Sequence, residues 1–136
     1  MKSKSLIAVI VCLLAALVGC RGGESDSPEN IYIAYEADSG RAVTMGVGDE
    51  LQIILDENQS TGYLWSVVTN DEEVLRQSGE PSFVIESDRE GAGGEKTYTF
   101  RAIAPGTSAL VLVNAMEGEA AVDPQLIFEL TVEVVE

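Results

Sequence analysis

Apolar side chains recur at every second position in several parts of this sequence. Between Phe128 and Val134, each apolar residue but the last is followed by a glutamate or a threonine. Tyr98, Phe100 and Ala102 show the same alternation. Successive side chains of a β-strand point to opposite faces of its sheet, so a period of two predicts strands with one buried and one solvated face. This pattern limits the chain to a largely β architecture.

Shorter apolar runs complete the pattern. The strands that we expect lie at 31–35, 51–55, 83–85, 97–102, 109–113 and 126–135, and a further strand begins at Tyr63. Turn-forming residues separate the runs at 46–49, 59–62, 91–94, 105–106 and 122–124. Seven or eight short strands at this spacing predict an all-β fold, an immunoglobulin-like β-sandwich. Only 71–77 is expected to form a short helical turn.

The first twenty residues have the features of an export signal. Lys2 and Lys4 precede an apolar stretch at 6–19, and 17–20 matches the bacterial lipobox, in which small residues precede a cysteine. As a helix this stretch would be about 21 Å long, which is short of a hydrocarbon core of roughly 30 Å. We therefore expect removal of the signal peptide, lipid attachment at Cys20 and anchoring to a membrane through that lipid.

Residues 21–30, RGGESDSPEN, are small, polar and charged, and we expect them to form a flexible tether. The remaining segment, 31–136, is long enough for one hydrophobic core and not for two. Arg21 does not match the Asp retention signal of bacterial lipoproteins. We therefore expect a cell-envelope location at the outer membrane, facing the periplasm or the cell surface.

Composition excludes several classes of activity. The sequence has no histidine, and its two cysteines are Cys12, in the removable stretch, and Cys20. The exported domain therefore lacks a thiol nucleophile, a disulfide framework and the commonest general base and soft metal ligand. We expect no enzymatic activity, no metal and no other cofactor.

The net charge of the chain limits the classes of partner that it can bind. The chain has 8 basic and 23 acidic residues, and loss of Lys2 and Lys4 leaves 6 basic residues and a net charge of −17. Such a chain is a poor ligand for nucleic acid. Solubility outside the cytoplasm explains the acidic charge, and a basic partner is the alternative explanation.

Two segments are suited to contact with a partner. In the first, NQSTGYLW at 58–65, Asn58 can form an Asx-type turn, Ser60 and Thr61 place small hydroxyl groups at the apex, and Gly62 permits positive φ. Tyr63 and Trp65 share a strand face, so at least one should anchor the base of the loop to the core. The same residues are equally compatible with an ordinary hairpin or inter-sheet loop that has no role in binding.

The second segment is Gly91-Ala92-Gly93-Gly94. Three glycines in four residues lose much entropy on ordering, so such a loop stays mobile or brings its backbone close to another surface. The two readings are backbone contact with a partner and a loose connection between strands.

The two motifs, in this order, resemble two of the three binding loops of the chagasin-type cysteine-protease inhibitors, inhibitor family I42. The first family loop reads Asn-Pro-Thr-Thr-Gly-aromatic-x-Trp and the second Gly-x-Gly-Gly. The resemblance extends over about 42–135. It implies a reversible, non-covalent inhibitor of papain-like cysteine proteases, whose first loop enters the active-site cleft while the glycine loop lies along the substrate groove. The protease-binding residues that it implies are Asn58, Gln59, Ser60, Thr61, Gly62, Tyr63, Gly91, Ala92, Gly93 and Gly94.

The chain departs from the family pattern at two places. Gln59 stands where the family commonly has Pro, a change that loosens the loop. The third family loop carries Arg-Pro-Trp, whereas 113–119 reads VNAMEGE, with Met116 as the expected contact. Arg and aromatic anchors are each worth over roughly 2 kcal/mol at interfaces, so their loss weakens binding. The alternative function is a lipid-anchored envelope binding or assembly module that uses the same loop end for a non-protease partner. In either case we expect a monomer.

Overall fold

The computed structural model describes residues 27–120 and 123–136. The expected signal peptide, the lipidation site Cys20 and the first part of the tether lie outside the described residues. No helix within the described ranges has both the length and the apolar character needed to cross a bilayer.

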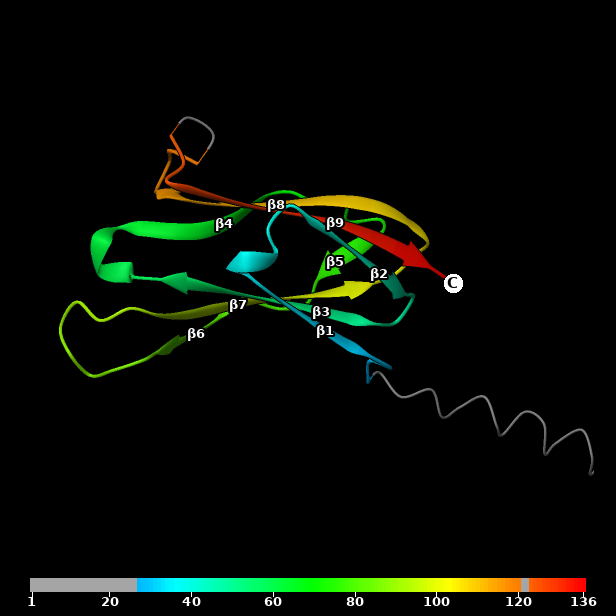
Figure 1. Ribbon diagram of the computed structural model, residues 1–136, viewed down its shortest axis with the longest axis horizontal. Coiled ribbons are helices and arrows are strands. Elements are labelled where there is room, and N and C mark those ends of the chain that lie inside the picture. Colours follow the sequence, from blue (N-terminus) through cyan, green and yellow to red (C-terminus); the bar gives the residue numbers. More distant parts are fainter. Residues whose placement is uncertain (1–26, 121–122) are drawn as a thin grey trace, which may run out of the picture.

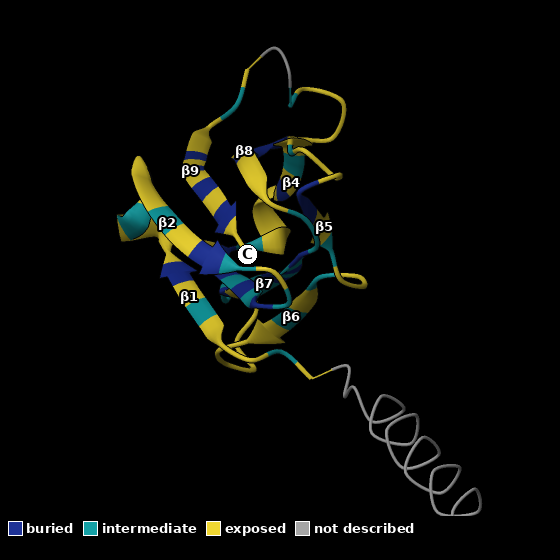
Figure 2. Ribbon diagram, turned by 90° about the vertical axis from the view of Figure 1, so that its right-hand side faces the viewer, coloured by how far each residue is buried: buried dark blue, intermediate teal, exposed yellow. Residues whose placement is uncertain are grey.

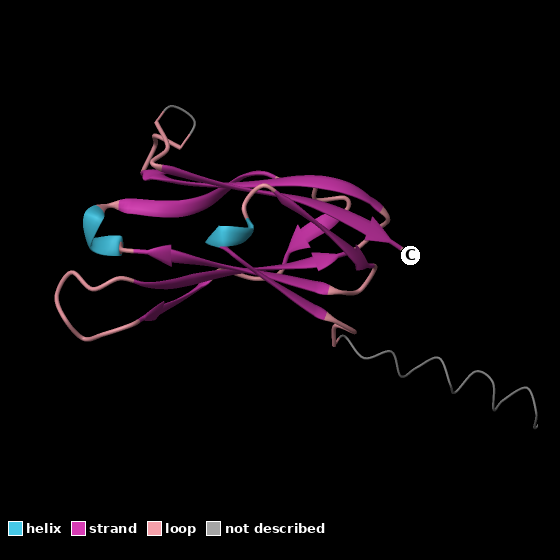
Figure 3. Cartoon of the chain, viewed as in Figure 1, coloured by secondary structure: helices cyan, strands magenta, loops and turns pink. Residues whose placement is uncertain are grey.

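Nine strands in the described ranges form two sheets packed face to face (Figures 1 and 3). The five-stranded sheet contains β1 (Ile31–Tyr35), β3 (Glu50–Glu57), β7 (Gly94–Ala102) and β5 (Leu75–Gln77) in that order, with β6 (Ser82–Ile85) also paired to β7. The four-stranded sheet contains β2 (Arg41–Gly46), β9 (Leu126–Val135), β8 (Gly106–Met116) and β4 (Tyr63–Thr69). Two short 3-10 turns are present, η2 (Glu36–Asp38) and η3 (Gln59–Thr61). The predicted immunoglobulin-like β-sandwich is confirmed.

The expected helical turn at 71–77 is only partly correct. Two hydrogen bonds to Asp71 O, from Val74 N at 3.1 Å and from Leu75 N at 2.9 Å, close a single turn. Leu75–Gln77 is instead strand β5, in which Leu75 is fully buried and pairs with Ala102 of β7. Burial and cross-strand pairing outweigh a weak local preference, and this extra strand raises the count above the seven or eight expected.

The core lies between the sheets and follows the predicted alternation. In β9 the buried residues are Phe128, Leu130, Val132 and Val134, with exposed residues between them. Figure 2 shows this as alternating buried and exposed bands along the strand. In β3 the same period resolves an apparently continuous apolar run: Leu51, Ile53 and Leu55 are buried, and so is Glu57.

The two ends of the sandwich carry different connections. The β3–β4, β6–β7 and β8–β9 connections gather at one end, on the left of Figure 1. The start of β1 and the β2–β3 and β7–β8 turns lie at the opposite end. We call the first of these the loop end, comprising the described residues 58–62, 86–93, 117–120 and 123–125.

Candidate functional site

The β3–β4 loop is held by its own hydrogen bonds. Asn58 Oδ1 accepts from Ser60 N at 3.1 Å and from Ser60 Oγ at 2.6 Å. Thr61 Oγ1 donates to Asn58 O at 2.7 Å. These contacts form the Asx-type turn that the sequence predicts, and they shape η3. Gln59, Ser60, Thr61 and Gly62 are exposed at its apex.

Gly62 ends this turn in the left-handed conformation. Its φ is 83°, and its N–H donates to Gln59 O at 3.2 Å. A Cβ on Gly62 would lie 3.5 Å from Met116 Cε, so the methionine methyl group lies beside the glycine. The first loop therefore contacts the end of β8, where Met116 is 43% exposed and pairs with Tyr63.

Replacing Gly62 by alanine is expected to lower the free energy of unfolding by about 1 kcal/mol, because an L side chain is strained at this φ. Urea unfolding measures the loss. Gly93→Ala is the matched control, since φ there lies outside the left-handed region and a Cβ would meet Glu57 O and Asn58 Cβ at ordinary distances of 3.7 and 3.9 Å. Equal losses in the two variants would contradict the conformational argument.

The first loop is also joined to the glycine segment. Asn58 Nδ2 donates to Gly91 O at 2.9 Å, across 33 residues of sequence. Gly91 is exposed, Ala92 and Gly93 are half-buried, and Gly94 is buried at the start of β7. A Cβ on Gly94 would lie only 2.2 Å from Val84 O, so this glycine is required for the packing of β6 on β7. Of the four residues predicted at 91–94, Gly94 is the one that lies in a strand of the sheet.

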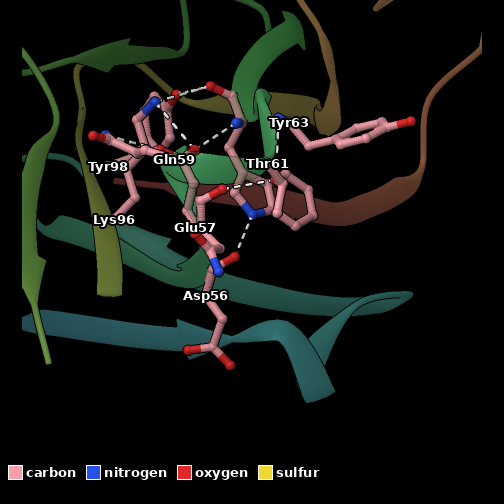
Figure 4. Close-up of polar contacts among 9 residues, drawn as sticks. Asp56, Glu57, Gln59, Thr61, Tyr63, Lys96 and Tyr98 are labelled. Carbon is pink, nitrogen blue, oxygen red and sulfur yellow. Dashed lines mark hydrogen bonds and ion pairs between the residues drawn. The ribbon is translucent and has the colours of Figure 1, made fainter. Parts of the chain in front are cut away.

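A buried polar cluster supports the base of the first loop (Figure 4). Glu57 Oε2 accepts from Trp65 N at 2.6 Å and from Lys96 Nζ at 3.4 Å. Trp65 O accepts from Lys96 Nζ at 3.1 Å and from Tyr98 Oη at 2.7 Å, and Trp65 Nε1 donates to Asp56 O at 2.8 Å. These bonds join β3 and β7 of one sheet to β4 of the other. Trp65 is 3% exposed and is the anchor that the sequence predicts at the base of the loop.

Sequence reasoning did not single out Glu57 or Lys96. The signal was the strand period itself: Leu51, Ile53 and Leu55 place position 57 on the buried face. In the same way, Tyr98 and the residues after it place position 96 on the inner side of β7. An acid and a base that both continue a buried face indicate a buried ion pair. The side chain of Gln59 also bonds to the acid of this ion pair, since its Nε2 donates to Glu57 Oε1 at 3.2 Å.

Burial in this cluster raises the pKa of Tyr98 to about 12, and the charge of Glu57 contributes in the same direction. The neutral phenol is the form that donates to Trp65 O. Because the ordinary pKa is 10.0, the folded state holds this proton more tightly than the unfolded state does. The contribution of protonated Tyr98 to the free energy of unfolding is complete below pH 10 and is lost as the pH rises toward 12.

The free energy of unfolding should therefore fall above pH 10 by about 1 kcal/mol per pH unit on account of Tyr98. Urea unfolding at a series of pH values measures the slope. Tyr98→Phe should be less stable at neutral pH and show a shallower alkaline slope, whereas Tyr35→Phe, at an exposed tyrosine of β1, should keep the slope of the original protein. A slope unchanged in Tyr98→Phe would contradict the assignment.

A groove of about 530 Å³ lies among the segments of the loop end. Its lining comes from both sheets and from all three connections: Asp56, Glu57, Asn58, Thr61, Tyr63, Glu86, Gly93, Gly94, Asn114, Gln125 and Leu126. No group of three or more potential metal ligands among His, Cys, Asp and Glu occurs in the part of the chain that the structure describes. The loop end thus combines exposed backbone and small hydroxyl side chains on a cross-linked base, an arrangement suited to binding rather than to chemical conversion.

A family model described as Chagasin family peptidase inhibitor I42 matches residues 44–132, which span β2 to β9 and all three connections of the loop end. A sequence search of curated proteins found no match.

Solved structures show the same fold. The crystal structure of the cysteine protease inhibitor EhICP2 from Entamoeba histolytica aligns with a TM-score of 0.70 and 19% identity, over 80% of this chain and 100% of that one. The solution structure of Amebosin gives 0.64 and 23%, over 78% and 98%. PbICP-C, solved in complex with falcipain-2, gives 0.53 and 14%, over 84% and 95%.

Proposed function

The chain belongs to the chagasin family of peptidase inhibitors, and we propose that it inhibits papain-like cysteine proteases reversibly and without covalent chemistry. Residues 58–63 and 91–94 would enter the active-site cleft, with Met116 as a contact at the third position. As a member of an inhibitor family, the chain is not an enzyme. PbICP-C, a structural neighbour, was solved in complex with falcipain-2, and that complex supports a cysteine protease as the target class.

One observation carries the proposal for the binding residues. The three segments expected to contact a protease are far apart in sequence, yet they touch: Asn58 bonds to Gly91, and Gly62 lies beside Met116. Cross-linking of this kind fixes the relative positions of the loops before a partner arrives. A preorganised surface loses less conformational entropy on binding and so retains more of its contact energy as affinity.

The cross-links also bear on the missing proline at position 59. Gln59 does not restrict the backbone as proline does, but its side chain bonds to Glu57, and the Asn58 side chain holds Ser60. These hydrogen bonds replace part of the rigidity that a proline would supply. The first loop therefore remains a suitable wedge despite this departure from the family pattern.

The test is inhibition of papain and of cathepsin-type proteases by the purified protein. We expect rapid, reversible inhibition that is competitive with a peptide substrate, with the inhibitor recovered uncleaved. Full protease activity at high micromolar concentrations of the protein would contradict the proposal.

A second function is favoured by the third segment. Where the family has Arg-Pro-Trp, this chain presents Met116 and two glutamates, Glu117 and Glu119, so the usual anchors are absent. An envelope binding or assembly module would use the same loop end for another protein. Recovery of one stoichiometric non-protease partner, in an experiment where proteases remain uninhibited, would favour this second function.

We also propose lipid anchoring at Cys20 in a bacterial cell envelope, at the outer membrane. The support is the lipobox and the position of the described N-terminal residues at the end opposite the loops (Figure 1). With this geometry the loops would point away from the bilayer. Cys20→Ser is expected to move the protein from the membrane fraction to the soluble fraction, while Cys12→Ser should leave it in the membrane fraction. If Cys20→Ser and Cys12→Ser were both found in the membrane fraction as the original protein is, lipidation at Cys20 would be contradicted.

A further inference from the structure

We propose that the thioether of Met116 is a modification site, at which oxidation by a peroxide reversibly weakens binding by the loop end. The product is methionine sulfoxide, which replaces a flexible apolar side chain by a polar, chiral one. This inference rests on the proposed function and names a means of regulating the same site. Two observations carry it: the exposure of this sulfur atom, and its position against the first loop.

The fold exposes one of the two sulfur atoms in 21–136. These atoms belong to Met45 and Met116, because both cysteines precede residue 21. Met45 is 1% exposed and belongs to the core between the sheets, whereas Met116 is 43% exposed at the end of β8. Trp65, another oxidisable side chain, is 3% exposed. Because oxidation follows exposure, burial protects Met45 and Trp65 and leaves the Met116 thioether open to attack.

The reaction needs only the peroxide. A lone pair on Met116 Sδ attacks one peroxide oxygen, so that an S–O bond forms as the O–O bond breaks. With hydrogen peroxide, the departing hydroxide takes up a proton and leaves as water. The sulfur loses two electrons and the peroxide gains them. A methionine sulfoxide reductase, with a thiol as the source of electrons, restores the thioether.

Met116 lies where the first loop meets the end of β8. Its Cε would be 3.5 Å from a Cβ on Gly62, and the residue pairs with Tyr63 of β4. Its backbone is held by the next connection, since Glu119 N donates to Met116 O at 2.9 Å. The sulfur is bonded to this methyl group, so an added oxygen enters the contact with Gly62. Oxidation should therefore shift the first loop as well as change the surface of the third segment.

The same change should lower affinity at the proposed interface. Met116 is the expected apolar contact in the segment that lacks the family's Arg-Pro-Trp. A protease docked on the loops would cover this side chain and remove its water. A thioether loses little by this, whereas a sulfoxide oxygen left without a hydrogen-bond donor is costly to cover. We expect oxidation to raise the inhibition constant about tenfold.

The modification can be tested without a protease. The purified protein is treated briefly with hydrogen peroxide, and peptide mass spectrometry follows the addition of an oxygen atom to each methionine. We expect Met116 to react well before Met45 in the folded protein, and both to react at similar rates in urea. In NMR spectra the amide resonance of Gly62 should shift on oxidation and return after treatment with the reductase, while that of Gly79, in a distant exposed turn, should not move. Equal rates at the two methionines of the folded protein, or an unmoved Gly62 resonance, would overturn the proposal.

Inhibition provides the second measurement. The protein is oxidised, the peroxide is destroyed with catalase, and only then is the protease added, because the catalytic thiolate of the protease is itself oxidisable. The inhibition constant should rise about tenfold on oxidation and recover after treatment with the reductase. Met116→Leu removes the sulfur, so its inhibition constant, whatever its value, should be the same with and without peroxide. Met45→Leu, a volume-conserving change in the core, is the matched control and should remain sensitive to peroxide.

The outcomes separate this inference from the proposed function. An unchanged inhibition constant after complete oxidation of Met116, or sensitivity that persists in Met116→Leu, would overturn the regulation and leave the proposed function standing. If the untreated protein inhibits no protease, the proposed function fails. The peptide map and the Gly62 resonance then still decide whether Met116 is an oxidation site that acts on the first loop.

Discussion

Replacing Lys96 by methionine should lower the free energy of unfolding by about 3 kcal/mol, one of the two largest effects that we expect. Lys96 is the cation bonded to Glu57, whose side chain is fully buried. Removing one member of a buried ion pair leaves the other charge without compensation, which is far more costly than the pair itself is favourable. Urea unfolding at neutral pH measures the loss.

Two further variants separate charge from packing. The double variant Glu57→Gln with Lys96→Met should recover much of the lost stability, because glutamine can still accept from Trp65 N without a buried charge. Arg41→Met removes the exposed ion pair with Asp38, in which Arg41 is 72% exposed, and should change stability by less than about 0.5 kcal/mol. If Lys96→Met and Arg41→Met gave equal losses, the cluster would not be an electrostatic support of the loop.

Thr61→Trp should raise the inhibition constant by about a thousandfold or more, equivalent to at least about 4 kcal/mol. Thr61 is exposed at the apex of the first loop, and its hydroxyl group bonds to Asn58 O and accepts from Tyr63 N. An indole at this position is too large for a wedge fitted to a narrow cleft, and it removes both hydrogen bonds. A competition assay with a fluorogenic peptide substrate measures the constant.

The controls for Thr61 distinguish shape from folding. Thr61→Ser keeps the hydroxyl group and should inhibit nearly as well as the original protein. Thr107→Trp places the same bulk on an exposed threonine of β8 at the opposite end of the sandwich and should leave inhibition unchanged. Undiminished inhibition by Thr61→Trp would mean that the β3–β4 loop does not enter the cleft.

Much of the fold could be predicted because its signals are local. The period of two identified β7 and β9, and glycine, proline and asparagine marked the turns. Strand β5 could not be predicted in this way, since its three residues have no periodicity and are held by pairing with β7. Position 94 shows a similar limit: the sequence displays a glycine, but only the approach of Val84 O explains why it must be one.

In the candidate site, too, the features set by neighbouring residues could be predicted and those set by contacts between distant segments could not. The turn within 58–62 could be predicted because Asn58, Ser60 and Gly62 act on their own backbone. The bond from Asn58 to Gly91 and the contact of Gly62 with Met116 depend on how two sheets place distant loops. Asn114 was equally hidden, because it lines a groove whose other walls come from β3, β4, β7, β9 and the connections between strands.

The parallel pairing of β2 with β9 has a consequence for when this protein becomes active. Arg41 pairs with Leu130, so one of the first strands of the domain has its partner in the last described strand. Contacts between positions so far apart in sequence form late, since the long intervening chain must first be ordered. Strand β9 also lies between β2 and β8, and its first residue, Leu126, pairs with Asn114 beside the groove. A partly synthesised chain that still lacks β9 therefore cannot assemble the loop end, and binding competence should appear only in the final step of folding.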